Sequence, residues 1–271
     1  MDDQLAAIDF EIAQFAVPIY DMSGKRAPIL LGTGFFLKIA ARYFIVTAGH
    51  VLTNERECEL GVPGTRGLYL LPPMFRSHVG SGSIHDFDFA FDELPPPVSA
   101  ALSRRYRAVP ISWTGSNHVP NEMYIYTMVG FPTSRNKPGI RQNMLHAVAH
   151  PFHAGTLVYE EYERRGLDVA LHLALGLQPL GIKNVDGSVR TSPNPRGISG
   201  CGVWCVGTPD AIAAGQRKVA LVGIGVRYDK NSKHVEATRI AVLLEAMRDL
   251  YPELSPHIPR SEYVEVDFHL L

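Results

Sequence analysis

Three residues of this 271-residue chain have types and surroundings suited to acyl-transfer chemistry: His50, Asp88 and Ser199. Ser199 lies in a glycine-rich segment, Gly-Ile-Ser-Gly-Cys-Gly at residues 197–202. A serine hydroxyl is a weak nucleophile, so it needs a neighbouring base and donors for the oxyanion that develops. Imidazole suits the role of base because its pKa lies near working pH. We therefore interpret Ser199 as the nucleophile, His50 as the base and Asp88 as the group that orients the imidazole.

The neighbours of His50 and Asp88 favour these roles. His50 follows an apolar, β-forming segment, Tyr-Phe-Ile-Val-Thr at residues 43–47, and then two small residues that leave space beside the ring. Asp88 opens the segment Asp-Phe-Ala-Phe, and a carboxylate there could accept a hydrogen bond from the ring and stabilise the imidazolium. Asp86 and Asp92 are alternatives to Asp88, but we expect Asp86 to lie in the loop before that strand.

Three short motifs resemble those of trypsin-like (chymotrypsin-fold) serine proteases. They are Thr-Ala-Gly-His at residues 47–50, Asp-Phe-Ala-Phe at 88–91 and Gly-x-Ser-Gly at 197–200. Their order along the chain is also the order His, Asp, Ser of that family, and it differs from the orders in subtilisins and α/β-hydrolases. The resemblance covers roughly residues 30–245 and is specific at these three motifs.

The resemblance implies an all-β fold of two antiparallel six-stranded barrels, residues 9–100 and 110–237, with a C-terminal α-helix at 238–251. It also implies a serine endopeptidase that hydrolyses peptide bonds through an acyl-enzyme on Ser199. In the family, the backbone N–H groups of the serine and of the glycine two residues before it form the oxyanion hole. Here these are Ser199 and Gly197.

The composition and the hydrophobic pattern suit elements that could position such a site. The chain is 46% apolar and contains 24 glycines and 20 prolines, which is typical of a β protein with many turns. Short segments rich in β-forming residues are predicted as strands at 43–47, 67–71, 88–91, 123–132, 157–159, 169–173, 203–206 and 219–226. Apolar residues recur at 240, 243, 244 and 247, which predicts the C-terminal helix.

Two positions depart from the zymogen-type trypsins. Ile198 stands where those enzymes carry an aspartate that pairs with a newly freed N-terminus, so we do not expect activation by N-terminal cleavage. Pro193, six residues before the serine, stands where the resemblance places the base of the primary pocket. Because Pro193 carries no charge, selection of Arg or Lys by a basal aspartate is not expected. Val226 and Tyr228 are predicted to contact the substrate, and Tyr228 would narrow the pocket.

Cys201 is a rival nucleophile, since chymotrypsin-fold cysteine proteases exist. The nucleophile of those proteases also has a glycine two residues before it, and Cys201 has Ser199 at that position. We therefore expect Cys201 to be a small buried residue. Cys58, Cys201 and Cys205 are the only cysteines, and we expect no disulfide framework.

No metal or organic cofactor is expected. Four histidines could suggest a metal site: His146, His150, His153 and His172. Metal binding needs three or four converging ligands, and Pro151 interrupts the helix that would place the first two on one face. We expect these side chains to be solvated or hydrogen-bonded.

The formal net charge of −1 favours neither nucleic acid nor an anionic membrane as partner. The N-terminal residues show no secretory signal pattern, so we expect a cytoplasmic protein of the standalone bacterial intracellular type. The expected partners are a protein or peptide substrate and a regulatory protein. The alternative function is a catalytically silent pseudoprotease that binds proteins, and an esterase on the same triad is a third option.

Overall fold

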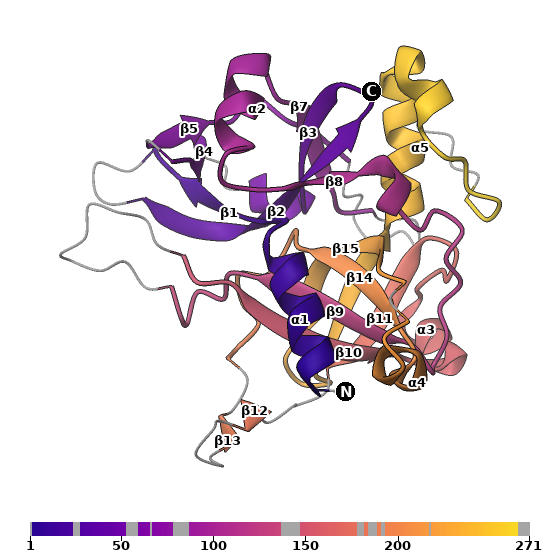
Figure 1. The fold of residues 1–271 in the computed structure, drawn as a ribbon. Coiled ribbons are helices and arrows are strands. Elements are labelled where there is room, and N and C mark those ends of the chain that lie inside the picture. Colours follow the sequence, from indigo (N-terminus) through magenta and orange to yellow (C-terminus); the bar gives the residue numbers. More distant parts are fainter. Residues whose placement is uncertain are drawn as a thin grey trace.

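The computed structural model describes residues 2–23, 28–52, 59–65, 67–77, 87–136, 147–177, 182–183, 189–190, 193–216 and 218–264. Figure 1 shows two β-structures, one above the other, with short helices on their outer surfaces. No helix in these ranges combines the length and the apolar character needed to cross a bilayer.

The first half of the chain forms an eight-stranded sheet. Its strands are β1 (Ala16–Asp21), β2 (Ile29–Ile39), β3 (Arg42–Thr47), β4 (Leu60–Pro63), β5 (Leu68–Leu70), β6 (Phe75–Arg76), β7 (Ala90–Glu93) and β8 (Ala108–Pro110). The order is β5-β4-β1-β2-β3-β7-β6, and β8 lies parallel to β2. Thr47 at the end of β3 pairs with Ala90 at the start of β7. This register brings the residues after β3 beside those before β7.

The second half contains a closed barrel of six antiparallel strands. They are β9 (Ile125–Gly130), β10 (His150–Thr156), β11 (His172–Leu177), β14 (Gly202–Gly207), β15 (Ala220–Asp229) and β16 (His234–Arg239), in the order β10-β11-β16-β15-β14-β9. Closure pairs every strand on both sides and removes exposed sheet edges. Two further strands, β12 (Ile182–Lys183) and β13 (Val189–Arg190), pair with each other.

The helices lie outside these strands (Figure 1). They are α1 (Asp2–Ala13), α2 (Pro96–Leu102), α3 (Tyr159–Arg165), α4 (Pro209–Ala213) and α5 (Ile240–Leu250), with 3₁₀ turns η1 (Gly49–Leu52), η2 (Ile111–Trp113) and η3 (Pro252–His257). In α5 the residues Leu243, Leu244 and Met247 are buried against the core, as the spacing of its apolar residues requires. Helix α1 contacts β9 and β10, and its Asp9 lies 3.0 Å from Nε2 of His153.

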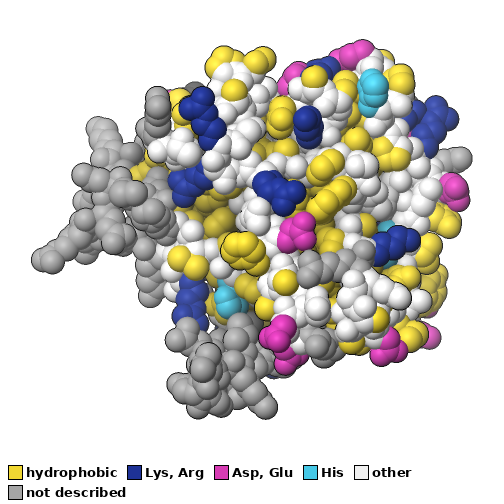
Figure 2. Space-filling model, in the orientation of Figure 1, with side chains coloured by type: hydrophobic (Ala, Val, Ile, Leu, Met, Phe, Trp, Pro, Cys, Tyr) yellow, Lys and Arg dark blue, Asp and Glu magenta, His cyan; other side chains and the backbone are white. Residues whose placement is uncertain are grey.

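On the face shown in Figure 2, the described Lys and Arg side chains stand apart from one another among apolar and uncharged ones. This distribution suits a chain whose formal net charge is only −1.

The predicted fold class is confirmed: the protein is mostly β, with a closed six-stranded barrel, a curved sheet and a C-terminal helix, as in a chymotrypsin-like double barrel. The first half differs from the prediction in detail. Its sheet has eight strands rather than six, and within the described residues β5 and β6 form its ends and do not pair with each other.

Two helices replace expected β-structure. Residues 9–13, predicted to begin the first barrel, belong to α1, where Leu5, Ile8 and Ile12 form one buried face. The strand predicted at 157–159 is wrong, because β10 ends at Thr156 and α3 begins at Tyr159. The charges of α3 explain this: acidic residues occupy its first turn and basic residues its last, which favours a helix through its dipole.

Candidate active site

His50 and Asp88 are brought together by the pairing of β3 with β7. His50 lies in η1, directly after β3, and Asp88 lies two residues before β7. Nδ1 of His50 is 2.5 Å from Oδ2 of Asp88, and the backbone N–H of His50 donates to Oδ1 at 2.8 Å. The carboxylate therefore holds both the ring and its main chain, which places Nε2 on the side of the ring away from Asp88.

The other acidic candidates do not take this position. Asp92 accepts hydrogen bonds from the backbone N–H of Glu93 at 2.8 Å and from the hydroxyl of Tyr251 at 3.4 Å, and burial raises its pKa. Asp86 lies outside the described residues. The N–H of Asp88 is itself 3.4 Å from Oγ1 of Thr238, on the last strand of the barrel.

Ser199 lies in the loop before β14, and this loop is anchored to the first sheet through Thr33. The N–H of Thr33 donates to the carbonyl of Ser199 at 2.9 Å, and its hydroxyl donates to the carbonyl of Gly197 at 2.9 Å. The same hydroxyl accepts from the N–H of Phe131 at 3.0 Å, and the carbonyl of Thr33 accepts from the hydroxyl of Thr47 at 2.7 Å. Thr33 thus joins the loop that carries Ser199, β2 and the end of β9.

Gly200 is required by this close contact between the two halves. Its φ of +86° lies in the left-handed region, and a Cβ there would clash with the carbonyl of Thr33 and the hydroxyl of Thr47. Only glycine allows the residue after Ser199 to approach the first sheet so closely.

Gly197 and Ser199 present backbone N–H groups at the site. The carbonyl of Arg196 accepts from the N–H and the hydroxyl of Thr133, at 2.9 and 3.2 Å. Because a trans peptide points its N–H and C=O in opposite directions, the N–H of Gly197 is directed away from Thr133. Among the hydrogen bonds of the described residues, none is donated by the N–H of Gly197 or Ser199. Two such donors could stabilise an oxyanion.

His50, Asp88, Gly197 and Ser199 line one cleft of about 1170 Å³. Val226 and Tyr228, predicted to contact the substrate, also line it. Pro193, predicted at the base of the pocket, is buried and does not line the cleft, whereas Pro195 does.

Cys201 is fully buried, and burial raises the pKa of its thiol to about 12. The thiolate is the nucleophilic form of cysteine, so a thiol that remains protonated is inert. Cys205 is buried as well, and burial raises its pKa. Both are free thiols, and Cys58 lies outside the described residues.

The three described histidines considered for metal binding, His150, His153 and His172, do not converge on one site. His153 contacts Asp9 of α1, and His172 lines the cleft that also holds His50 and Ser199, with its Nδ1 3.2 Å from the carbonyl of Asp168. His150 packs edge-on against Phe152, and its burial lowers its pKa. His146 lies outside the described residues, and within the described part of the chain no three potential ligands come together to hold a metal.

Sequence reasoning missed several residues of the site. Thr33 had a local signal, since it stands between two glycines in a strand, but its role depends on contacts with residues 164 positions away. Arg165 and Glu236 also line the cleft, and no motif marks them; His172, which the sequence suggested only as a metal ligand, lines it as well.

No family model matches the chain, and no curated protein matches it. Many solved structures are similar to this chain, and two of them are these. One is the serine protease domain of the Sesbania mosaic virus polyprotein, with 16% identity, a TM-score of 0.46, and coverage of 88% of this chain and 91% of that chain. The other comes from work on the coupled folding and binding of the intrinsically disordered Sesbania mosaic virus VPg protein, with 15% identity, a TM-score of 0.46, and coverage of 88% and 90%. Likeness at this level assigns no activity to this chain.

Proposed function

We propose that the protein is a serine endopeptidase that cleaves a protein or peptide substrate. The observation that carries this proposal is the double contact of Asp88 with His50 in a cleft that also holds Ser199 and the two glycine-loop N–H groups. A structural histidine has no need of a carboxylate that fixes both its ring and its backbone at the edge of a cleft.

The residues have distinct roles in the proposed reaction. Oγ of Ser199 attacks the carbonyl carbon of the scissile bond while His50 accepts its proton. The N–H groups of Gly197 and Ser199 stabilise the oxyanion, and Asp88 stabilises the imidazolium. His50 then gives the proton to the leaving amine, which departs and leaves an acyl group on Ser199. Water, activated by His50, attacks the acyl group and releases it from the serine.

Hydrolysis of an unfolded, internally quenched protein substrate tests the proposal. We expect Ser199→Ala and His50→Ala to lower kcat by about 10⁴-fold or more, and Asp88→Asn by about 10³- to 10⁴-fold. Cys201→Ala is the matched control and should keep its activity. Activity that survives in Ser199→Ala, or that disappears in Cys201→Ala while the protein remains folded, would contradict the proposed mechanism.

A further inference from the structure

The charged residues that line the cleft are unequally divided. The four cations are Arg165, Arg196, Arg227 and Lys230, and the two carboxylates are Asp88 and Glu236. The chain as a whole has a formal net charge of −1. Asp88 is already bound to His50. The cleft therefore has one carboxylate, Glu236, to set against four cations.

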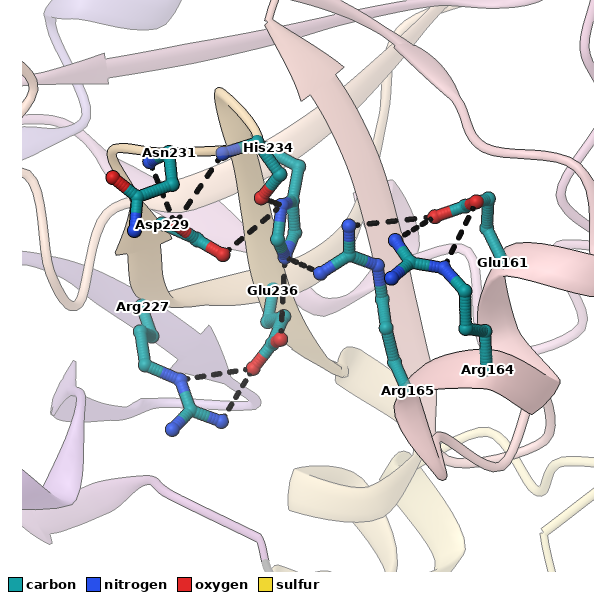
Figure 3. A network of polar contacts seen from close by, with 9 residues as sticks. Glu161, Arg164, Arg165, Arg227, Asp229, Asn231, His234 and Glu236 are labelled. Carbon is teal, nitrogen blue, oxygen red and sulfur yellow. Dashed lines mark hydrogen bonds and ion pairs between the residues drawn. The ribbon is translucent and has the colours of Figure 1, made fainter.

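Glu236 is occupied by Arg227, its cross-strand neighbour. Nε and Nη2 of Arg227 donate to one carboxylate oxygen, Oε2, at 3.0 and 2.6 Å, and the other oxygen lies 3.3 Å from Nε2 of His234 (Figure 3). The side chain of Glu236 is only 14% exposed, whereas that of Arg227 is 72% exposed. Glu236 thus holds the guanidinium of Arg227 in place, while most of the Arg227 side chain faces solvent.

Arg165 reaches the same network from the end of α3 (Figure 3). Its Nη1 lies 2.6 Å from Nε2 of His234, and its Nη2 lies 3.4 Å from Glu161. Its Nε is buried and has no hydrogen-bond partner within the described residues. Glu161 and Asp229, the other acids of the network, do not line the cleft. Glu236 is therefore the acid of this network that lines the cleft, and its carboxylate is already engaged by Arg227 and His234.

Arg196 and Arg227 lie on the two segments next to the nucleophile. Arg196 is three residues before Ser199 in the same loop. Arg227 lies two residues after Gly225, which pairs with the residues directly after Ser199. The carbonyl of Gly225 accepts from the N–H of Gly200 at 2.7 Å, and its N–H donates to the carbonyl of Cys201 at 2.8 Å. Arg196 is exposed and forms no ion pair within the described residues.

Building on the proposed protease function, we propose that the cleft selects substrates with a glutamate or aspartate side chain next to the scissile bond, bound by Arg227 and Arg196. Guanidinium groups bind carboxylates through paired N–H donors and through opposite charge. A glutamine side chain is neutral and lacks the second contribution. A substrate lysine or arginine would meet these guanidiniums and could reach Glu236 only by displacing Arg227.

Cleavage of a proteome-derived peptide library, read by mass spectrometry, tests the inference. We expect Glu and Asp to be enriched on the N-terminal side of the cleaved bond. For a matched pair of quenched peptides, kcat/KM should be at least about tenfold higher with Glu than with Gln, and lowest with Lys. Arg227→Gln should remove most of the advantage of Glu over Gln. Arg164→Gln, which removes an exposed cation paired with Glu161 outside the cleft, is the control and should not change it.

The outcomes separate this inference from the proposed function. Cleavage by the wild type with no acidic preference, or with a preference for Lys or Arg, overturns the inference and leaves the protease function standing. If the wild type cleaves nothing, binding of labelled peptides to Ser199→Ala decides, measured by fluorescence anisotropy. Binding of a Glu-rich peptide at least about tenfold tighter than its Gln counterpart, lost in the double variant with Arg227→Gln, supports the inference; equal binding overturns it.

Discussion

Thr33 performs no chemistry, yet its hydroxyl bonds to the carbonyl of Gly197 and accepts from the N–H of Phe131. Thr33→Val preserves the shape of the side chain and removes both contacts. We expect kcat to fall by about 10- to 100-fold, because the carbonyl of Gly197, and with it the loop that presents the N–H groups of Gly197 and Ser199, is then less firmly held. The free energy of unfolding should fall by about 1–3 kcal/mol.

Thr33→Ser restores the hydroxyl and should recover most of kcat, which separates positioning of the loop from general loss of stability. Measuring kcat and chemical unfolding for both variants checks this prediction. An unchanged kcat in Thr33→Val would show that the hydroxyl does not position the loop.

At the scale of single residues, sequence patterns predicted His50, Asp88 and Ser199 because each lies in a short motif, and the structure places all three at one cleft. The pair of Arg227 with Glu236 could not be predicted in this way. It exists because a register shift between β15 and β16 sets these two residues opposite each other.

The loop that carries Ser199 depends on Gly200 as an element. In Gly200→Ala a Cβ would clash with main chain of the first sheet at a φ of +86°. We expect the free energy of unfolding to fall by about 3–5 kcal/mol, since strain and overpacking act together.

Gly215→Ala is the matched control. Gly215 also has a positive φ, +71°, but a Cβ there meets no atom within 4 Å in the described structure. Only backbone strain remains, so the expected loss is about 1–2 kcal/mol. Chemical unfolding of both variants measures the difference, and equal losses would show that Gly200 is not closely packed against the first sheet.

Among the elements, α5 was predictable and α3 was not. The apolar spacing in α5 has the helical period over eleven residues. Helix α3 has seven residues and only Tyr162 buried, so it shows no such period. Its preceding residues are β-formers, which produced the incorrect strand at 157–159. A tertiary contact adds to the favourable charges of this helix: the hydroxyl of Tyr162 accepts from the N–H of Ala174 on β11.

The stability of the whole molecule should depend on the protonation of His118. Burial and, second, the charge of Arg239 lower its pKa from 6.5 to about 4. As pH falls below 6.5 the unfolded chain binds a proton that the folded chain does not, so stability is lost between pH 6.5 and about 4. After allowance for its partial exposure, we expect His118 to account for about 1–2 kcal/mol of this loss.

Unfolding by denaturant at pH 7, 5.5 and 4.5 measures this dependence. His118→Gln should flatten the slope but not abolish it, because burial lowers the pKa of His150 as well. His257→Gln, at an exposed position, is the control and should keep the slope of the wild type. A slope in His118→Gln as steep as that of the wild type would contradict the prediction.

At the scale of the whole molecule, both halves contribute to the site. The first half supplies His50, Asp88 and the anchoring Thr33, and the second half supplies Ser199 and the four cations that line the cleft. The fold class could be predicted because three ordered motifs and many short strands indicated it. The eight-stranded form of the first sheet could not, because it depends on pairings such as β8 with β2 that no local pattern marks.

Labelling with a fluorophosphonate probe, followed by mass spectrometric mapping of the modified residue, tests the central claim most directly. The probe reacts with a serine only when a base activates it. We expect Ser199 to be modified in the wild type and in Cys201→Ala, no modification in Ser199→Ala, and labelling slowed by about 10³-fold or more in His50→Ala. Modification of a different residue, or equally fast labelling without His50, would contradict the proposed site.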